Sequence, residues 1–408
     1  MRRTNSFAIV FTHPERVIQL AVGCVVLWNK LNFKRRQSFF KGNLDWDSKA
    51  EYDEFKGWVG SATAQQIIRK NDASWRGFFR LLKAKREGRL PPHIKQVSPP
   101  GYWKDRRTGK YRLRIIIRRD CYRIDGRNIT LPKRITGRMK GAPRWLHGKQ
   151  GTLELRYDES RRCWYAYQSI VVTEPLLQPC GRNRAFVDFG VLYPLTAIIE
   201  GVNRPIAYSG APLLSDWWYL TNKIAEYQHL LKVVNGKHSS ARLSRLYRIR
   251  RRRFRQEINS YVSHFVKFCH TNGVDTIIAG ELTGIRANTQ GWNTKSSAMV
   301  NNFWSHKYLA DRLIWTAENY GIKVLLIDER GSSSHCPWCN SQNVIRRGRL
   351  FKCLDCRREA HRDVVGSLNI GLVHGSKQFR EGDSNRVMAH PEVIFAFSKI
   401  TSKASPIL

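Results

Sequence analysis

The chain has 408 residues, and its 71 Lys and Arg against 32 Asp and Glu give a formal net charge of +39. That length exceeds what one hydrophobic core usually serves, so we expect two or three domains. This net charge lies far outside the range of ordinary soluble enzymes, and it predicts a polyanionic partner. A membrane is disfavoured as that partner, because the longest apolar stretch, Val17 to Trp28, is interrupted by Gln19 and too short to cross a bilayer. It predicts a buried helix.

The aromatic residues and cysteines further limit which class of protein this chain can be. The 13 Trp, 15 Tyr and 18 Phe are too many for a disordered basic tail, and they offer flat faces for stacking on bases. Nine Cys is an odd number in a long chain without a signal peptide, which favours a reducing compartment and metal binding over disulfides. We therefore expect a cytoplasmic protein.

The first 180 residues predict a helical domain and an antiparallel β domain. Phe7 to Phe11 predicts a strand, and apolar residues at helical spacing over 15–87 predict a small helical lobe. Prolines and glycine between 91 and 101 mark a boundary. Alternating or β-branched runs then predict strands that form a small barrel. These runs are Tyr111 to Ile117, Cys121 to Leu131 with a hairpin signal at Asp125-Gly126, Thr152 to Tyr157, and Trp164 to Val172.

From Gly181 onward, strands alternate with long helical segments, which predicts an α/β domain. The expected strands are Ala185 to Val187, Leu195 to Ile199, Val274 to Ala279 and Val324 to Ile327, and the expected helices are Leu213 to Phe268, Tyr308 to Asn319 and Asp363 to Val373. Residues 376–408 are polar apart from an apolar patch near Ile394 to Phe397. We expect this tail to be poorly ordered.

Two cysteine pairs give the strongest local signal. Cys336 and Cys339 form one CxxC pair, and thirteen residues later Cys353 and Cys356 form another. Four thiolates at this spacing predict a closed, structural Zn²⁺ site, a zinc ribbon. Four unrelated core cysteines or a redox dithiol are the alternatives, and neither explains two pairs at ribbon spacing. Arginines around the ribbon, including Arg346 and Arg347, predict contact with phosphate.

Three acidic residues predict a catalytic metal site. Asp188 and Glu281 each close an apolar strand, and Asp363 begins the helix after the cysteines. Gly190 follows Asp188 and lets a phosphate backbone approach closely. Taken singly, an acid that closes a strand is more often a turn residue or a helix cap. In this order and together with the ribbon, the three acids predict carboxylates that share two Mg²⁺ ions, with Mn²⁺ as a substitute, in phosphodiester cleavage.

A protein-kinase interpretation is excluded. Asp188-Phe189-Gly190 and His361-Arg362-Asp363 match two kinase tripeptides, but in reversed order. No glycine-rich phosphate loop precedes them, and Leu368 stands at the position of the catalytic-loop Asn.

An arginine-rich helical stretch predicts nucleic-acid backbone binding. Apolar residues at helical spacing alternate with arginines from 241 to 256, and no Asp or Glu occurs there. A solvated helix face would normally include Glu, so phosphate binding is the favoured interpretation. The predicted nucleic-acid-binding residues are Arg242, Arg245, Arg248, Arg251, Arg252 and Arg255, with Arg346 and Arg347 on the ribbon.

These motifs together resemble TnpB, the RNA-guided endonuclease family of insertion sequences, related to compact type V CRISPR effectors. In that family the first carboxylate lies in a strand that ends in D-x-G, here at 187–190, and the second in a strand that ends in E-x-L, here at 280–285. A serine-rich lead precedes the ribbon, here at 332–334, and the third carboxylate lies in H-R-D-x-x-G-x-x-N-I, here at 361–370. Val365 departs from the commoner pattern, which has Asn.

The resemblance implies a multidomain α+β fold with an RNase H-like (RuvC) α/β nuclease domain at 181–330 and 358–375, interrupted by the zinc ribbon at 331–357. It also implies a β-barrel wedge domain at 1–14 and 101–180 and a helical recognition lobe at 15–100. The implied activity is Mg²⁺-dependent cleavage of double-stranded target DNA beside a short motif. The implied partners are a guide RNA from the element's end and the target DNA, in a prokaryotic, nucleoid-associated setting, with a monomer favoured.

Two alternatives stay open at this stage. A nuclease-independent, RNA-guided DNA-binding repressor would use the same scaffold, although the intact acidic triad disfavours it. A transposase acting directly on DNA ends would use a carboxylate triad equally well. Strand joining distinguishes the transposase from the endonuclease.

Overall fold

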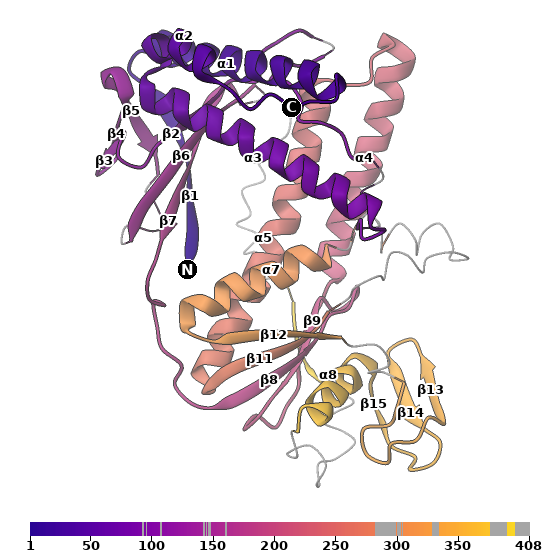
Figure 1. Cartoon of the computed structure of the whole chain (residues 1–408). Coiled ribbons are helices and arrows are strands. Elements are labelled where there is room, and N and C mark those ends of the chain that lie inside the picture. The colour runs from indigo at the N-terminus through magenta and orange to yellow at the C-terminus, as the bar shows by residue number, and fades with distance from the viewer. Residues whose placement is uncertain are drawn as a thin grey trace. The chain divides into compact units, whose positions relative to one another are not determined.

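The computed structural model describes most of the chain as two compact units, Met1–Glu174 and Pro175–Leu408 (Figure 1). The described residues are 1–281 without 92, 93, 95, 107, 142, 144, 146, 147 and 160, together with 299, 303, 305–328, 334–375 and 390–395. Within these residues no helix is both long and apolar enough to cross a membrane.

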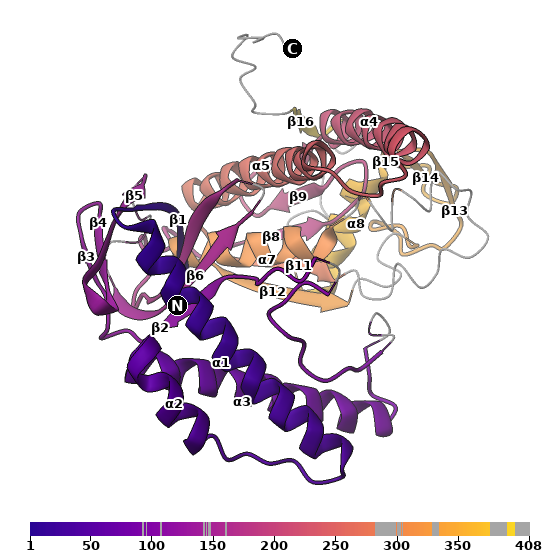
Figure 2. The same cartoon turned by 90° about the horizontal axis from the view of Figure 1, so that it is seen from above.

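Three helices form the helical part of the first unit: α1 (Pro14–Phe40), α2 (Lys49–Val59) and α3 (Ser61–Arg86). They pack against one another, as Figure 2 shows. Pro14 begins α1, where a missing N–H costs no helical hydrogen bond. The apolar stretch from Val17 to Trp28 is largely buried inside this helix, as the sequence predicted. Gly23 lets α1 and α2 approach closely, since a Cβ there would lie 2.6 Å from Cγ1 of Val59.

A seven-stranded antiparallel sheet completes the first unit. In space the strands run β2-β6-β7-β1-β5-β4-β3, with β2 and β3 at the two ends. Their bounds are β1 Arg2–Phe11, β2 Arg114–Ile117, β3 Arg123–Asp125, β4 Asn128–Leu131, β5 Ile135–Lys140, β6 Lys149–Asp158 and β7 Cys163–Val171, with a 3-10 turn at Pro132–Arg134. The predicted hairpins β3–β4 and β6–β7 are confirmed. The first strand is longer than predicted: exposed and buried residues alternate along Arg2–Phe11, but the first two buried residues, Arg3 and Asn5, are polar, so an apolar pattern does not reveal them.

The second unit is built on a mixed six-stranded sheet in the order β12-β11-β8-β9-β10-β16. The strands are β8 Asn183–Asp188, β9 Leu195–Ile199, β10 Ile206–Tyr208, β11 Val274–Glu281, β12 Lys323–Asp328 and β16 Glu392–Ile394. Strand β11 runs parallel to both β8 and β12, whereas β9 is antiparallel to β8 and β10. The carboxyl ends of β8, β11 and β12 therefore meet at one edge of the sheet.

Helices cover both faces of this sheet (Figure 1). They are α4 Ala211–Asn235, α5 Ala241–Thr271, α7 His306–Ala317 followed by the 3-10 turn Glu318–Tyr320, and α8 Arg362–Val373. Val187 and Ala279 belong to the core shared with α4, α5 and α7, whereas Phe186 and Ile278 belong to the core shared with α8 and the cysteine segment. Alternate residues of the central strands thus pack into the cores on opposite faces, as expected for a sheet that is buried on both faces. The strands predicted from Gly181 onward are confirmed, as are the helices α7 and α8. The segment from Leu213 to Phe268, predicted as mostly helical, forms two helices, α4 and α5, separated by residues 236–240.

A three-stranded sheet lies between β12 and α8 in the chain and carries the cysteines. It consists of β13 Val344–Arg347, β14 Leu350–Cys353 and β15 Glu359–His361, with β14 in the centre. The tail differs in part from the prediction of poor order. Glu392–Ile394 forms the edge strand β16, because Glu392 N–H donates to Pro205 O at 2.8 Å and Ser209 N–H donates to Ile394 O at 2.9 Å. The segments 376–389 and 396–408 lie outside the described residues.

Candidate functional site

The four cysteine sulfurs converge at one point of the ribbon. The ligand atoms of Cys336, Cys339, Cys353 and Cys356 all lie within 4.8 Å of one another. Cys336 Sγ lies 3.6 Å from Cys356 Sγ, and Cys339 Sγ lies 3.5 Å from Cys353 Sγ. Four sulfurs at 2.3 Å around a tetrahedral Zn²⁺ would be separated by about 3.8 Å. The residues therefore fit a structural zinc ion, which would supply folding stability and leave no open position for substrate.

The environment of these thiols differs from one to the next. Burial raises the pKa of Cys336 to about 12. Burial also acts on Cys353, but the N–H groups of Cys356 and Asp355 outweigh it and lower the pKa of Cys353 to about 7. Backbone N–H groups that point at sulfur stabilise the thiolate, which is the form that binds metal.

Asp188 and Asp363 lie close together on two elements that pack against each other. Asp188 closes β8, and Asp363 lies in the first turn of α8. A Cβ placed on Gly366 would lie 3.0 Å from Cγ of Asp188, so this carboxylate rests directly on the backbone of α8. A Cβ placed on Gly190 would lie 3.8 Å from Oδ2 of Asp363. The two glycines thus leave no side chain between the first and third predicted carboxylates.

Glu281 ends β11, the parallel neighbour of β8, and its side chain is exposed. Among the described residues, the four cysteines are the group of metal-ligand side chains that lies close enough to hold an ion. Asp188 and Glu281 end neighbouring strands at the same edge of the sheet, and the contacts through Gly366 and Gly190 link Asp188 with Asp363. The three carboxylates are not among the groups of described residues that are compact enough to hold one ion. The donor set suits Mg²⁺, because hard divalent ions take carboxylate oxygens.

Arg349 contacts Asp363, and the sequence alone did not reveal this. Arg349 Nη1 donates to both carboxylate oxygens, at 2.8 and 3.0 Å. The side chain of Asp363 is 9% exposed and that of Arg349 is 37% exposed. In the sequence, Arg349 is one of several arginines around the ribbon, the group predicted to contact phosphate. The signal that could have found it is the hairpin itself, because the β14–β15 register pairs Leu350 with His361 and brings the preceding turn beside α8.

His361 is a buried residue beside this ion pair. Its ring packs edge-on against Tyr193 at a centroid distance of 4.9 Å. Burial lowers its pKa, although the charge of Asp363 acts in the opposite direction. Neither ring nitrogen has a hydrogen-bond partner within the described part of the chain.

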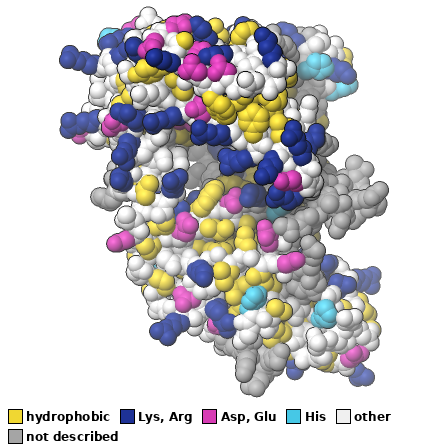
Figure 3. Space-filling model, viewed as in Figure 1, with side chains coloured by type: hydrophobic (Ala, Val, Ile, Leu, Met, Phe, Trp, Pro, Cys, Tyr) yellow, Lys and Arg dark blue, Asp and Glu magenta, His cyan; other side chains and the backbone are white. Residues whose placement is uncertain are grey.

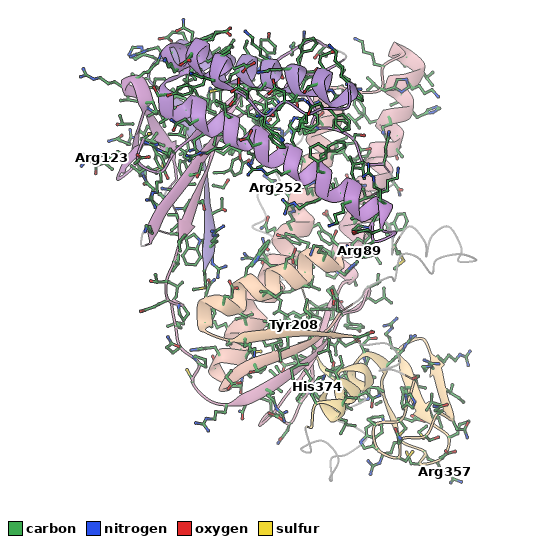
Figure 4. The ribbon with its side chains drawn as sticks, in the orientation of Figure 1. Arg89, Arg123, Tyr208, Arg252, Arg357 and His374 are labelled. Carbon is green, nitrogen blue, oxygen red and sulfur yellow. The ribbon has the colours of Figure 1, made fainter. Side chains whose placement is uncertain are left out.

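The predicted arginine helix is α5, and Ser240 caps its first turn by accepting from Leu243 N–H. Arg248 is partly buried, whereas the other predicted α5 arginines are exposed, as are Arg346 and Arg347 on β13. On the face seen in Figure 3, Lys and Arg are spread more widely than Asp and Glu. Figure 4 shows Arg252 on α5 and Arg357 on the ribbon. The positive charge is therefore available to a polyanion.

The segments that contain these residues match known protein families. Residues 167–286, which include Asp188 and Glu281, match the family model "Probable transposase". Residues 306–370, which include the cysteines and Asp363, match the model "Cas12f1-like, TNB domain". A TnpB-like protein of Acidianus two-tailed virus is 30% identical over 402 residues, covering 90% of this chain and 86% of that protein. This chain belongs to the TnpB family.

Other relatives of this TnpB-family chain are more distant. The CRISPR-associated endodeoxyribonuclease Cas12f1 of Sulfoacidibacillus thermotolerans is 32% identical over 132 residues, which cover 31% of this chain and 29% of that protein. The solved Cas12f1–sgRNA–target DNA complex contains a chain with a TM-score of 0.55 at 15% identity, over 88% of this chain and 83% of that one. The mini-RNA-guided endonuclease CRISPR-Cas_phi3 gives 0.55 at 11% identity, over 94% of each chain. These two structures share the multidomain α+β fold.

Proposed function

We propose that this chain is an RNA-guided, Mg²⁺-dependent DNA endonuclease that cleaves double-stranded DNA beside a short motif. The observation that carries the proposal is the packing of Asp188 and Asp363 against Gly366 and Gly190. This packing lies at the sheet edge where strand β11 ends with Glu281, in a chain of the TnpB family. A neighbouring fold was solved with guide RNA and target DNA, and we propose the same partners here.

In this proposal Asp188, Glu281 and Asp363 hold two Mg²⁺ ions, with Mn²⁺ as a substitute. When bound, the ions activate water and stabilise the leaving oxygen. Gly190 lets the phosphate backbone approach the carboxylates. Arg349 orients Asp363 and offsets its charge until metal binds, because its Nη1 donates to both carboxylate oxygens.

We propose domain roles on the same basis. Residues 181–330 and 358–375 form the RuvC-type nuclease, and the ribbon at 331–357 helps load the target strand through Arg346 and Arg347. The sheet at 1–14 and 101–180 is the wedge domain, a barrel in this proposal, and the helices at 15–100 form the recognition lobe. The arginines of α5 bind phosphate groups of the nucleic-acid backbone, and the protein recognises the guide–target duplex by its shape. We propose a monomer in the prokaryotic cytoplasm, associated with the nucleoid.

The test is cleavage of a matched plasmid by the purified chain with its guide RNA in Mg²⁺. We expect Asp188→Ala to abolish cutting while target binding persists. Asp328→Asn is the matched control, because Asp328 ends β12 at the same sheet edge and lies outside the proposed triad. Full cutting by Asp188→Ala would refute the metal assignment. Binding without any cutting by the unaltered chain would identify a repressor, and strand joining would identify the transposase that one family model names.

A further inference from the structure

A cavity of about 220 Å³ is lined by residues of α4, α5 and the start of α7, and none of the three carboxylates lines it. Its walls combine aromatic rings with guanidinium groups. The lining residues are Trp217, Tyr247, Arg250, Arg251, Phe254, Arg255, Phe303, Ser305 and Tyr308. We call this the arginine–aromatic pocket. Its volume is below the roughly 300 Å³ of the smallest drug-sized pockets, so it suits one planar group and excludes a duplex.

The floor of the pocket is a set of packed rings. Phe303 packs edge-on against both Trp217 and Phe254, each at a centroid distance of 5.5 Å. Phe303 is 1% exposed and Trp217 is 7% exposed. Interlocked rings of this kind hold their positions without a ligand. The floor is therefore a preformed apolar surface.

The rim of the pocket is cationic. Arg250 is fixed, because it lies over Trp217 at 5.4 Å and over Tyr247 at 5.3 Å, and its Nη1 donates to Thr221 Oγ1 at 2.8 Å. Arg255 lies over the ring of Tyr308 at 5.0 Å. Arg251 is exposed, and no Asp or Glu is among the residues that line the pocket. Three arginines thus line the pocket without a lining carboxylate to offset their charge.

We propose that the arginine–aromatic pocket binds one unstacked nucleotide of a single-stranded nucleic acid. The base packs against the exposed ring of Tyr247 and the aromatic floor, and Arg251 and Arg255 contact its flanking phosphates. A pocket with arginines alone would bind any anion, and a pocket with aromatic rings alone would bind any apolar group. A nucleotide matches both features, because it combines a flat ring with a phosphate. This inference rests on the proposed function for the presence of nucleic acid, and it adds a site that the three carboxylates do not use.

The test compares Tyr247→Leu with Tyr219→Leu. Leucine keeps apolar volume and removes the ring. Both tyrosines are exposed, at 37% for Tyr247 and 59% for Tyr219, so both changes should leave the fold intact, and Tyr219 lies on α4 outside the pocket lining. The RNA-free full-length protein is titrated with a labelled single-stranded oligonucleotide and with an abasic strand of the same length.

We expect Tyr247→Leu to weaken binding of the base-bearing strand about tenfold and to leave abasic binding unchanged, since one base stacked on one ring has an effect of this size. Tyr219→Leu should change neither. Arg251→Gln should weaken both strands, and it should do so more than Arg252→Gln, which alters the adjacent exposed arginine outside the lining. Equal losses for the two strands in Tyr247→Leu, or equal effects of the two arginine changes, would overturn the proposal.

Two further arms separate other outcomes. If the unaltered chain binds neither strand, the proposed function fails; if it binds both and Tyr247→Leu does not discriminate between them, only the pocket proposal fails. Photocrosslinking with a 4-thiouridine strand should give adducts on the peptide that contains Tyr247 or Tyr308. Adducts confined to other peptides contradict the assignment. Tight binding of adenosine monophosphate, with no discrimination between the strands, would show that the pocket holds a free nucleotide instead.

Discussion

Gly366 is the position where one substitution tests the carboxylate geometry most directly. A Cβ there would lie 3.0 Å from Cγ and 3.1 Å from Oδ2 of Asp188. An unstrained contact between such atoms is about 3.5–4.0 Å. We therefore predict that Gly366→Ala displaces the Asp188 carboxylate by about half an ångström, and that Gly366→Val displaces it by about 1 Å or more.

The expected kinetic effect follows from that displacement. A misplacement of about 1 Å in a reacting group reduces the rate about 10²-fold, which corresponds to about 2.7 kcal/mol of barrier. We expect about this loss of cleavage for Gly366→Val and about tenfold for Gly366→Ala. Guide and target affinity should be unchanged, because neither substitution alters a charge. Single-turnover plasmid cleavage and a binding titration on the same preparation measure both quantities.

The matched control is Gly77→Val on α3, where nothing lies within 4 Å of the added Cβ. It reports the effect of valine in a helix without a carboxylate beside it, and its cleavage rate should match that of the unaltered chain. Unchanged cleavage by Gly366→Val would refute the packing of Asp188 against α8. A parallel loss of target binding would assign the defect to misfolding.

Three further predictions concern the ribbon, the ion pair and pH. Removing zinc with a chelator, or Cys353→Ser, should lower the melting temperature and abolish cleavage; full activity in metal-stripped protein would exclude a structural role. Arg349→Ala should slow cleavage about tenfold, because a loss of about 1.4 kcal/mol is the scale of one hydrogen bond to a charged group. Arg347→Ala should change target binding more than the cleavage rate. The reverse pattern would contradict the contact with Asp363. Burial lowers the pKa of His264, whose Nδ1 lies 2.7 Å from the Tyr208 hydroxyl. Below about pH 6.5 the unfolded chain gains a proton at this histidine that the folded chain does not, so the free energy of unfolding should fall as the pH drops through this range. Urea titrations at several pH values should show a flatter dependence for His264→Gln, and an unchanged slope would reject that account.

The features that sequence predicted well are those encoded over short distances. The ribbon follows from two CxxC pairs, and β8 and β11 follow from apolar runs that end at Asp188 and Glu281. The features that it missed depend on tertiary packing. Strand β16 forms because the distant backbone of Pro205 and Ser209 supplies its partners, and no local pattern reports such a partner. The role of Gly366 was missed for the same reason, since it depends on the distance to a carboxylate 178 positions away in the chain.

The ribbon and the third carboxylate are linked by the backbone and by one ion pair, so zinc bound at the four cysteines would affect the proposed reaction. Strand β15 runs directly into α8, so the residue that ends the ribbon sheet, His361, is separated from Asp363 by a single residue. Arg349 adds a second connection, from the β13–β14 turn to the Asp363 carboxylate. Asp188 and Glu281, in contrast, are fixed by strand pairing within the main sheet, which contains no zinc ligand. Loss of zinc should therefore displace Asp363 most directly, and Asp188 through its contact with Gly366 of α8, so that the proposed cleavage fails while the main sheet and the arginines of α5 still support nucleic-acid binding.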